Sequence, residues 1–566
     1  TLIMIQLNKL FMRNFFVKNT FKYCFLIFLI LPINVSLSQE KAIKKDKLSS
    51  VSKKLNVSVS NLDTPSIGSI GVRTRVNDVM QLDVWQDMSA SEIIQQLNDI
   101  PDVVSSHNLQ SLLIDLYLST SNPPKGSTDE IIKFVETKLI KIRNSGQNDK
   151  LYQIIKQLPQ GKRWEIWRRW LTEYEFLTHR DKETCERVKT ELANKNDYFW
   201  QMSRIFCLSI ENKLSQAQLT LDLIKSKGFS NLAFENLFKI INGEKINFVF
   251  DNNNNFKMEP IHIIMMDTLK IPIKVNFIAD FGVEYTSALL DLIYLSPKAR
   301  SFLLDKQINY QQVSSETIIE NYKSVSSGSL DIQKNFSLFL ESPTGYNRAN
   351  VWLSVVALND DIKKAEIILK IIKHEMTLGR LSYVINMYLP VLESMNSASL
   401  TKELNVSIQK IKIAANPSVF LNDNLANIIM LKKDTEWNWD ILLKENAWQL
   451  IPVFENAGML QPKSLNWLNV LNKNKQENVE EQKYNKWNIN SSLETFLLTK
   501  AIEEASNNDN KTLALILLAR LIGNNPFVDF DISQLLTIRK SLYKLGFVDL
   551  ANNLTVEIMT AKLIKF

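Results

Sequence analysis

The chain has 566 residues, 45% of them hydrophobic, but only 14 glycines and 15 prolines. Glycine scarcity weighs against glycine-dependent nucleotide-binding folds and turn-rich β-sandwiches, and favours long helices joined by short polar connections. The net charge of +7 is concentrated at the start, because residues 1–38 contribute four positive charges and residues 39–54 a further four, which leaves −1 for the rest. A nearly neutral body lacks the positive surface expected of a nucleic-acid-binding protein.

The first apolar segment, CFLIFLILPI, has the pattern of a secretory signal peptide. It follows a basic stretch, and Ser36 and Ser38 occupy the −3 and −1 positions of a cleavage site before Gln39. Ten apolar residues are too few to span a bilayer, which needs about 20. An uncleaved anchor is the alternative, but it would place Pro32 within the spanning helix. We therefore expect residues 1–38 to be removed and the mature protein to be periplasmic, without a stable membrane span.

Local signals along the rest of the chain are those of α-helices. The clearest are S-x-x-E capping boxes, in which a serine and a glutamate satisfy free backbone N–H groups at the start of a helix. These boxes are Ser89 with Glu92, Ser127 with Glu130, and Ser491 with Glu494. Apolar residues at helical spacing follow each box, so we predict helices beginning just after these serines.

The predicted fold is all-α, an α-solenoid of degenerate antiparallel helix pairs. The lysine-rich segment near the start is interpreted as a solvated linker, with weak attraction to anionic surfaces as the alternative. The predicted parts are a signal peptide (1–38), a polar, basic linker with an extended arm (39–80), a first helical-repeat region (81–250), a second helical-repeat region (258–470), a charged connector (472–486) and a C-terminal helical region (490–566).

A weak internal repeat supports the helix pairs. In four places a turn residue is followed five positions later by an alanine within an apolar helical segment. These alanines are Ala217, Ala365, Ala514 and Ala551. We expect each to lie where two helices leaving a tight turn approach most closely, because a larger side chain would separate them. The stretch around Ala551 is similar to a tetratricopeptide half-repeat, but the irregular spacing excludes a regular 34-residue array.

Two of the three cysteines, Cys185 and Cys207, lie in predicted helices joined by a turn centred on Asn196. They are equally distant from that turn, which places both sulfurs at the same height on paired helices. In an oxidising compartment the simplest prediction is a disulfide, with two buried thiols as the alternative. The sequence offers neither the additional ligands of a metal site nor the C-x-x-C of a redox enzyme.

Motifs for catalysis, cofactors or metals are absent from the sequence. The histidines, at positions 107, 179, 262 and 374, have no metal-ligand spacing, and no nucleophile elbow, phosphate-binding loop or dinucleotide fingerprint occurs. We therefore predict no catalytic residue, cofactor or metal.

Two stretches suggest other chemistry. In GKRWEIWRRWLTEYEF, Trp164, Trp167 and Trp170 recur at helical spacing between arginines, as in a base-stacking platform, although a packing face explains them better. In FLESPTGYNRA, Glu341 is faintly similar to the catalytic glutamate of lytic transglycosylases. The glycine-rich element that follows in those enzymes is missing, so we interpret Glu341 as a helix-end carboxylate.

The order of elements resembles an uncharacterised family of exported α-helical proteins from alphaproteobacteria. The resemblance rests on the stretches TPSIGSIGV, LDVWQDMS, NPPKG, TCERV with DYFWQMSRIFCLSIENKLSQAQLTLDLI and FENLFKIING, and GYNRANVWLSVVALNDDIKKAEIILKII, which span most of residues 64–400. It implies a helical-repeat fold and a two-cysteine first half, and it implies no reaction.

The sequence thus favours a non-catalytic periplasmic protein that binds protein or peptide as an adaptor or scaffold of the cell envelope. The first alternative is an enzyme or accessory protein of cell-wall turnover, since some lytic transglycosylases carry large helical superstructures. The second is a structural envelope protein without a discrete ligand.

Overall fold

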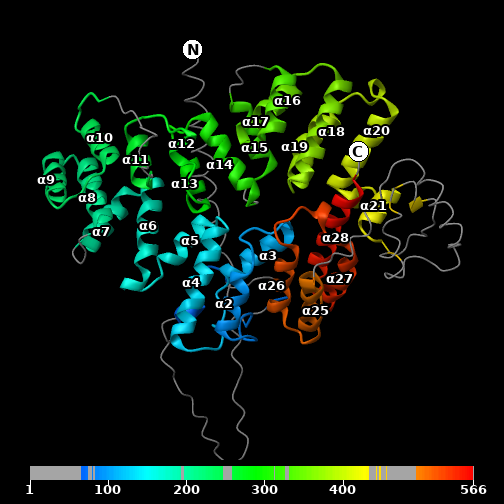
Figure 1. Cartoon of the computed structure of the whole chain (residues 1–566), viewed down its shortest axis with the longest axis horizontal. Coiled ribbons are helices and arrows are strands. Elements are labelled where there is room, and N and C mark those ends of the chain that lie inside the picture. The colour runs from blue at the N-terminus through cyan, green and yellow to red at the C-terminus, as the bar shows by residue number, and fades with distance from the viewer. Residues whose placement is uncertain are drawn as a thin grey trace, which may run out of the picture. The chain divides into compact units, whose positions relative to one another are not determined.

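The elements of the computed structural model are helical throughout the residues it describes (Figure 1). These residues are 66–73, 79–80, 83–192, 197–246, 258–310, 313–325, 330–432, 441–442, 445, 447, 454 and 493–564. The predicted signal peptide, most of the predicted arm and the predicted charged connector lie outside them. Within this part of the chain the only β-type contacts are three isolated bridges, so the all-α prediction is confirmed.

The first group of helices comprises α2 (Ala90–Asn98), α3 (His107–Leu118), α4 (Thr128–Asn144), α5 (Asn148–Ile155), α6 (Glu165–Leu177), α7 (Asp181–Leu192), α8 (Tyr198–Ile210), α9 (Leu214–Ser226), α10 (Leu232–Ile241), α11 (Pro260–Thr268), α12 (Val275–Ile278), α13 (Thr286–Leu290) and α14 (Pro297–Asn309). The second comprises α15 (Ser315–Ser324), α16 (Ile332–Glu341), α17 (Gly345–Val356), α18 (Asp361–Thr377), α19 (Leu381–Glu393) and α20 (Lys402–Ala415). The third comprises α21 (Asn424–Ile429), α25 (Leu493–Asn507), α26 (Lys511–Ile522), α27 (Leu535–Lys544) and α28 (Val548–Leu563). Short 3-10 helices include η1 (Ile67–Ser69) and η3 (Val283–Tyr285).

Two of the predicted capping boxes start helices as expected. The Ser89 hydroxyl accepts a hydrogen bond from the backbone N–H of Glu92, and the Glu92 carboxylate accepts one from the backbone N–H of Ser89. Ser127 and Glu130 make the same reciprocal pair at the start of α4. The third box includes Ser491, which lies outside the described residues.

The four alanines of the weak repeat are buried in helices α9, α18, α26 and α28. Each of these helices packs against the helix that precedes it in the chain, in the pairs α8 with α9, α17 with α18, α25 with α26, and α27 with α28. The four alanines therefore lie in packed helix pairs, and their position at the point of closest approach stays a prediction.

The buried side chains form two hydrophobic cores. The larger core draws on residues 80–303 and 413–563, and the smaller one on residues 308–411. The regions predicted as 81–250 and 490–566 therefore share one core, and the core boundaries do not follow the predicted division at 250–258. Helical periodicity shows which face of a helix is buried, but it does not show which distant helix covers that face.

The last helices of the chain pack on the first, with α26 and α28 beside α3 (Figure 1). Polar contacts reinforce this packing: the Ser106 hydroxyl and the Asn108 side-chain amide donate to the carboxylate of Glu557 at 2.6 and 2.8 Å. The backbone N–H of Ser105 donates to the carbonyl of Gly523 at 2.8 Å. An open solenoid does not predict this return of the chain to its beginning.

A buried lysine holds the first described segment in place. The Lys138 ammonium group donates to the carbonyls of Ile70 and Ser119 at 2.8 and 2.6 Å, and burial lowers its pKa to about 7.

None of the helices in the described part of the chain combines the length and apolar character needed to cross a membrane.

Candidate functional site

Cys185 on α7 and Cys207 on α8 lie opposite each other, as their equal spacing from the turn predicts. Their Sγ atoms are 2.02 Å apart and their Cα atoms 5.6 Å apart, so the two helices are joined by a disulfide. Both residues are buried in the larger core. The bond is structural in its setting, because it closes a helix pair and is not accessible to a substrate.

The four histidines lie on separate elements and make no common site. His262 in α11 is buried, and burial lowers its pKa to about 4. Its Nδ1 atom accepts a hydrogen bond from the backbone N–H of Glu259 at 3.1 Å. His179 precedes α7, with Nε2 3.6 Å from the carboxylate of Asp267. No group of three or more histidine, cysteine, aspartate or glutamate side chains suited to a metal ion occurs among the described residues.

The tryptophan stripe is a packing face, as predicted. Trp164, Trp167 and Trp170 are at most 5% exposed, and Trp170 stacks on Tyr174 with ring centroids 5.0 Å apart. The rings therefore offer no open faces on which bases could stack.

The arginines between these tryptophans are all paired with acidic residues. The pairs are Arg163 with Glu136 at 2.7 Å, Arg168 with Glu191 at 2.8 Å and Arg169 with Asp197 at 3.6 Å. Their charges are therefore compensated within the protein, which also argues against a phosphate-binding surface.

One side of α6 borders a hollow, which we call the α6 groove. Its volume is about 510 Å³, within the range of about 300 to 1,000 Å³ typical of ligand pockets. It is lined by Arg143 of α4, by Glu165, Ile166, Trp167, Arg169, Trp170 and Glu173 of α6, and by Glu284 and Tyr285 of η3. Three elements that are distant in the sequence thus combine aromatic, charged and apolar side chains around one space.

The α6 groove contains a carboxyl group with an unusual proton affinity. The pKa of Glu173 is raised to about 7, chiefly by burial and to a lesser extent by the negative charges of Glu259 and Glu284. The hydroxyl of Tyr285 donates a hydrogen bond to Glu173, and this bond and the charge of Arg169 act in the opposite direction. Carboxyl groups that titrate near neutral pH are typical of functional sites, although buried structural networks also contain them.

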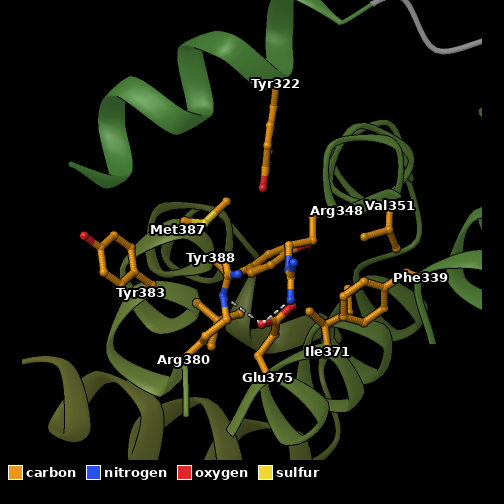
Figure 2. Close-up of a pocket in the computed structure, with 11 residues that line it drawn as sticks. Tyr322, Phe339, Arg348, Val351, Ile371, Glu375, Arg380, Tyr383, Met387 and Tyr388 are labelled. Atoms are coloured by element: carbon orange, nitrogen blue, oxygen red, sulfur yellow. Dashed lines mark hydrogen bonds and ion pairs between the residues drawn. The ribbon is translucent and has the colours of Figure 1, made fainter. Parts of the chain in front are cut away.

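Beside the smaller core lies a cluster of four charged side chains, three of which, Arg348, Glu375 and Arg380, are drawn in Figure 2. Arg348 of α17 lies 2.7 Å from Glu375 of α18 and 2.9 Å from Asp305 of α14, and Arg380, which precedes α19, lies 2.8 Å from Asp305 and 3.3 Å from Glu375. Figure 2 shows Glu375 between the two guanidinium groups, with Tyr322 pointing toward them from α15. Two positive and two negative charges compensate one another, which is the condition for burying them.

This charged cluster holds helices together and does not form a ligand pocket. The cavity beside it has a volume of about 20 Å³, enough for roughly one water molecule. Asp305 lies on α14, whose residues enter both cores, so the cluster ties the two cores to each other. Gly345, at the start of α17, allows the close approach of the helices, since a Cβ atom there would lie 2.2 Å from the carbonyl oxygen of Ser301.

No family model, curated protein or solved structure matches this chain. The resemblance to the exported alphaproteobacterial family therefore remains a prediction.

Glu341 is the last residue of α16 and is exposed, which confirms its interpretation as a helix-end carboxylate. Sequence reasoning missed the combination of Glu173 with Glu284 and Tyr285, because more than 100 residues separate these positions. It also missed the charged cluster. The one available signal was the placement of Arg348 and Glu375 among apolar residues of predicted helices, where an unpaired charge is costly.

Proposed function

We propose that the protein is a non-catalytic, exported helical protein that binds a segment of another protein or a peptide in the α6 groove, and that it acts as an adaptor or scaffold in the cell envelope. The observation that carries this proposal is the groove of about 510 Å³ with its aromatic and charged lining. Ile166, on its border, is 64% exposed, so the groove has an apolar rim available to a partner.

Capture of crosslinked partners from cells tests this proposal. A tagged chain would be compared with the variants Ile166→Arg, which places a bulky charge at the groove, and Leu219→Arg on α9, a matched control because Leu219 is 61% exposed. We expect one envelope protein to be recovered with the wild type and with Leu219→Arg, and to be lost with Ile166→Arg. Equal recovery from both variants would contradict binding at the groove.

A second function, in cell-wall turnover, is favoured by one specific observation. Glu173 has a pKa of about 7 beside an accessible groove, and an acid that acts near neutral pH needs such a value. Incubation of purified peptidoglycan with the wild type and with Glu173→Gln separates the two functions. Release of soluble fragments by the wild type alone would support catalysis, whereas no release by either protein would favour the binding role.

A further inference from the structure

The charges that line the α6 groove are unequal in number. Three carboxyl groups and two guanidinium groups face it. Arg169 is ion-paired with Asp197 at 3.6 Å, and its guanidinium group lies 4.5 Å from the ring centroid of Phe199. The charge of Arg169 is therefore shared between Asp197 and the groove, where it lowers the pKa of Glu173.

Arg143 is also engaged. Its Nε atom donates to the side chain of Asn144 at 3.2 Å, and its guanidinium group lies 5.8 Å from the ring centroid of Trp167. Two guanidinium groups that also have these other contacts therefore compensate the three carboxyl groups of the groove only in part.

The carboxyl groups of Glu173 and Glu284 are less fully compensated. Glu173 accepts the hydrogen bond of Tyr285, which carries no charge, and Glu284 makes no hydrogen bond or ion pair with the described residues. The charge of Glu284 acts to raise the pKa of Lys306, but the Lys306 ammonium group donates its hydrogen bonds to the carbonyls of Ala279 and Phe281. The groove therefore has an excess of negative charge on its Glu173 and Glu284 side.

Aromatic side chains lie next to this negative side. The rings of Trp170 and Tyr285 are 6.4 Å apart between centroids, and both residues line the groove. The indole N–H of Trp170, a buried residue, has no hydrogen-bond partner among the described residues. Carboxylates beside aromatic rings are a favourable environment for a cation with an alkyl stem, which combines ion pairing with apolar contact.

We propose that the α6 groove selects a polypeptide segment carrying a lysine or arginine side chain, whose charged group binds to Glu173 and Glu284 while its alkyl stem lies against the ring of Tyr285. This inference rests on the proposed binding function and specifies its ligand. Charge complementarity is the argument for this occupant, because a neutral or acidic segment would leave the two carboxyl groups uncompensated.

Binding of such a segment is coupled to loss of a proton from Glu173. The groups that act on this carboxyl are Tyr285 and Glu284 of η3, Arg169 of α6 and Glu259 before α11, and together with burial they set its pKa at about 7. Only the ionised form pairs with a cation, so lowering the pH from 8 to 6 reduces the competent fraction of the free protein about tenfold. A lysine side chain remains charged throughout this range.

Isothermal titration calorimetry with synthetic nine-residue peptides tests the inference. The peptides carry lysine, acetyl-lysine or glutamate at the central position of one alanine- and serine-based sequence, and chito-oligosaccharides serve as ligands of another class. The proteins are the wild type, Glu173→Gln, Glu284→Gln and the control Glu341→Gln, which changes an exposed carboxylate outside the groove. Glutamine at 173 keeps an acceptor for the Tyr285 hydroxyl, and circular dichroism checks that each variant is folded.

We expect the lysine peptide to bind the wild type and Glu341→Gln about tenfold more tightly than the acetyl-lysine peptide at pH 8. This preference should weaken about tenfold at pH 6, and Glu173→Gln should abolish both the preference and its pH dependence. Equal affinity for lysine and acetyl-lysine, no peptide binding up to about 1 mM, or binding of the oligosaccharide alone would overturn the inference.

These outcomes are distinguishable from failure of the proposed function. If Ile166→Arg loses a captured partner while the lysine peptide shows no preference, the groove binds protein but does not select a cation. If Ile166→Arg loses no partner, the binding function itself is contradicted.

Discussion

Replacing Glu375 by glutamine should strongly destabilise the protein. Glu375 is 4% exposed, its carboxylate lies 2.7 Å from Arg348 and 3.3 Å from Arg380, and the four-residue cluster is electrically neutral. The substitution leaves one uncompensated positive charge in the smaller core. Removing one partner of a buried ion pair costs about 3 to 5 kcal/mol of unfolding free energy, whereas exposed substitutions cost less than about 0.5 kcal/mol.

Urea denaturation followed by circular dichroism measures this loss. Glu366→Gln is the matched control, because Glu366 is an exposed residue on the same helix, α18. The double variant Arg348→Met with Glu375→Gln leaves Asp305 paired with Arg380, so it should lose less stability than the sum of the two single variants. If Glu375→Gln were as stable as Glu366→Gln, the account of the cluster as a necessary tie between helices would be refuted.

Three further predictions concern stability. Reduction of the bond between Cys185 and Cys207, which are 22 residues apart, should cost about 3 kcal/mol in chemical denaturation, and two alkylated thiols without prior reduction would contradict the disulfide. The pKa of His262 is about 4 in the folded protein and near 6.5 in the unfolded chain, so the unfolded chain binds more protons between pH 6.5 and pH 4. The free energy of unfolding should therefore fall by about 3 kcal/mol as the pH drops from 6.5 to 4, and the fall should be smaller in His262→Gln. Gly345→Ala should lower the urea midpoint by the equivalent of about 1 to 3 kcal/mol, since Ser301 leaves no room for a Cβ atom; an unchanged midpoint would refute this close approach.

The local features of the fold could be predicted from sequence. The capping boxes at Ser89 and Ser127 and the buried position of Ala217 depend on residues within one helix or one turn, so a short stretch of sequence contains the relevant chemistry. The pairing of Cys185 with Cys207 was accessible for the same reason, because their equal distance from a short turn fixes their relative height.

The features that depend on distant parts of the chain could not be predicted. The hydrogen bonds from Ser106 and Asn108 to Glu557 join residues about 450 positions apart, and no local pattern indicates such a contact. The candidate site shows the same division. The aromatic stripe that includes Trp170 was visible at helical spacing, but Glu284 and Tyr285 reach it from another element, so neither the groove nor the altered pKa of Glu173 could be inferred.

The measurement that tests the central claim most directly is site-specific photocrosslinking in intact cells. A photoreactive amino acid would replace Ile166 at the α6 groove or, in a parallel strain, Leu219 on α9, two positions with nearly equal exposure of 64% and 61%. If the groove binds a protein partner, illumination should yield a discrete higher-mass adduct from position 166 and none of the same mass from position 219. Absence of an adduct at 166 at matched expression, or the same adduct at both positions, would contradict the claim.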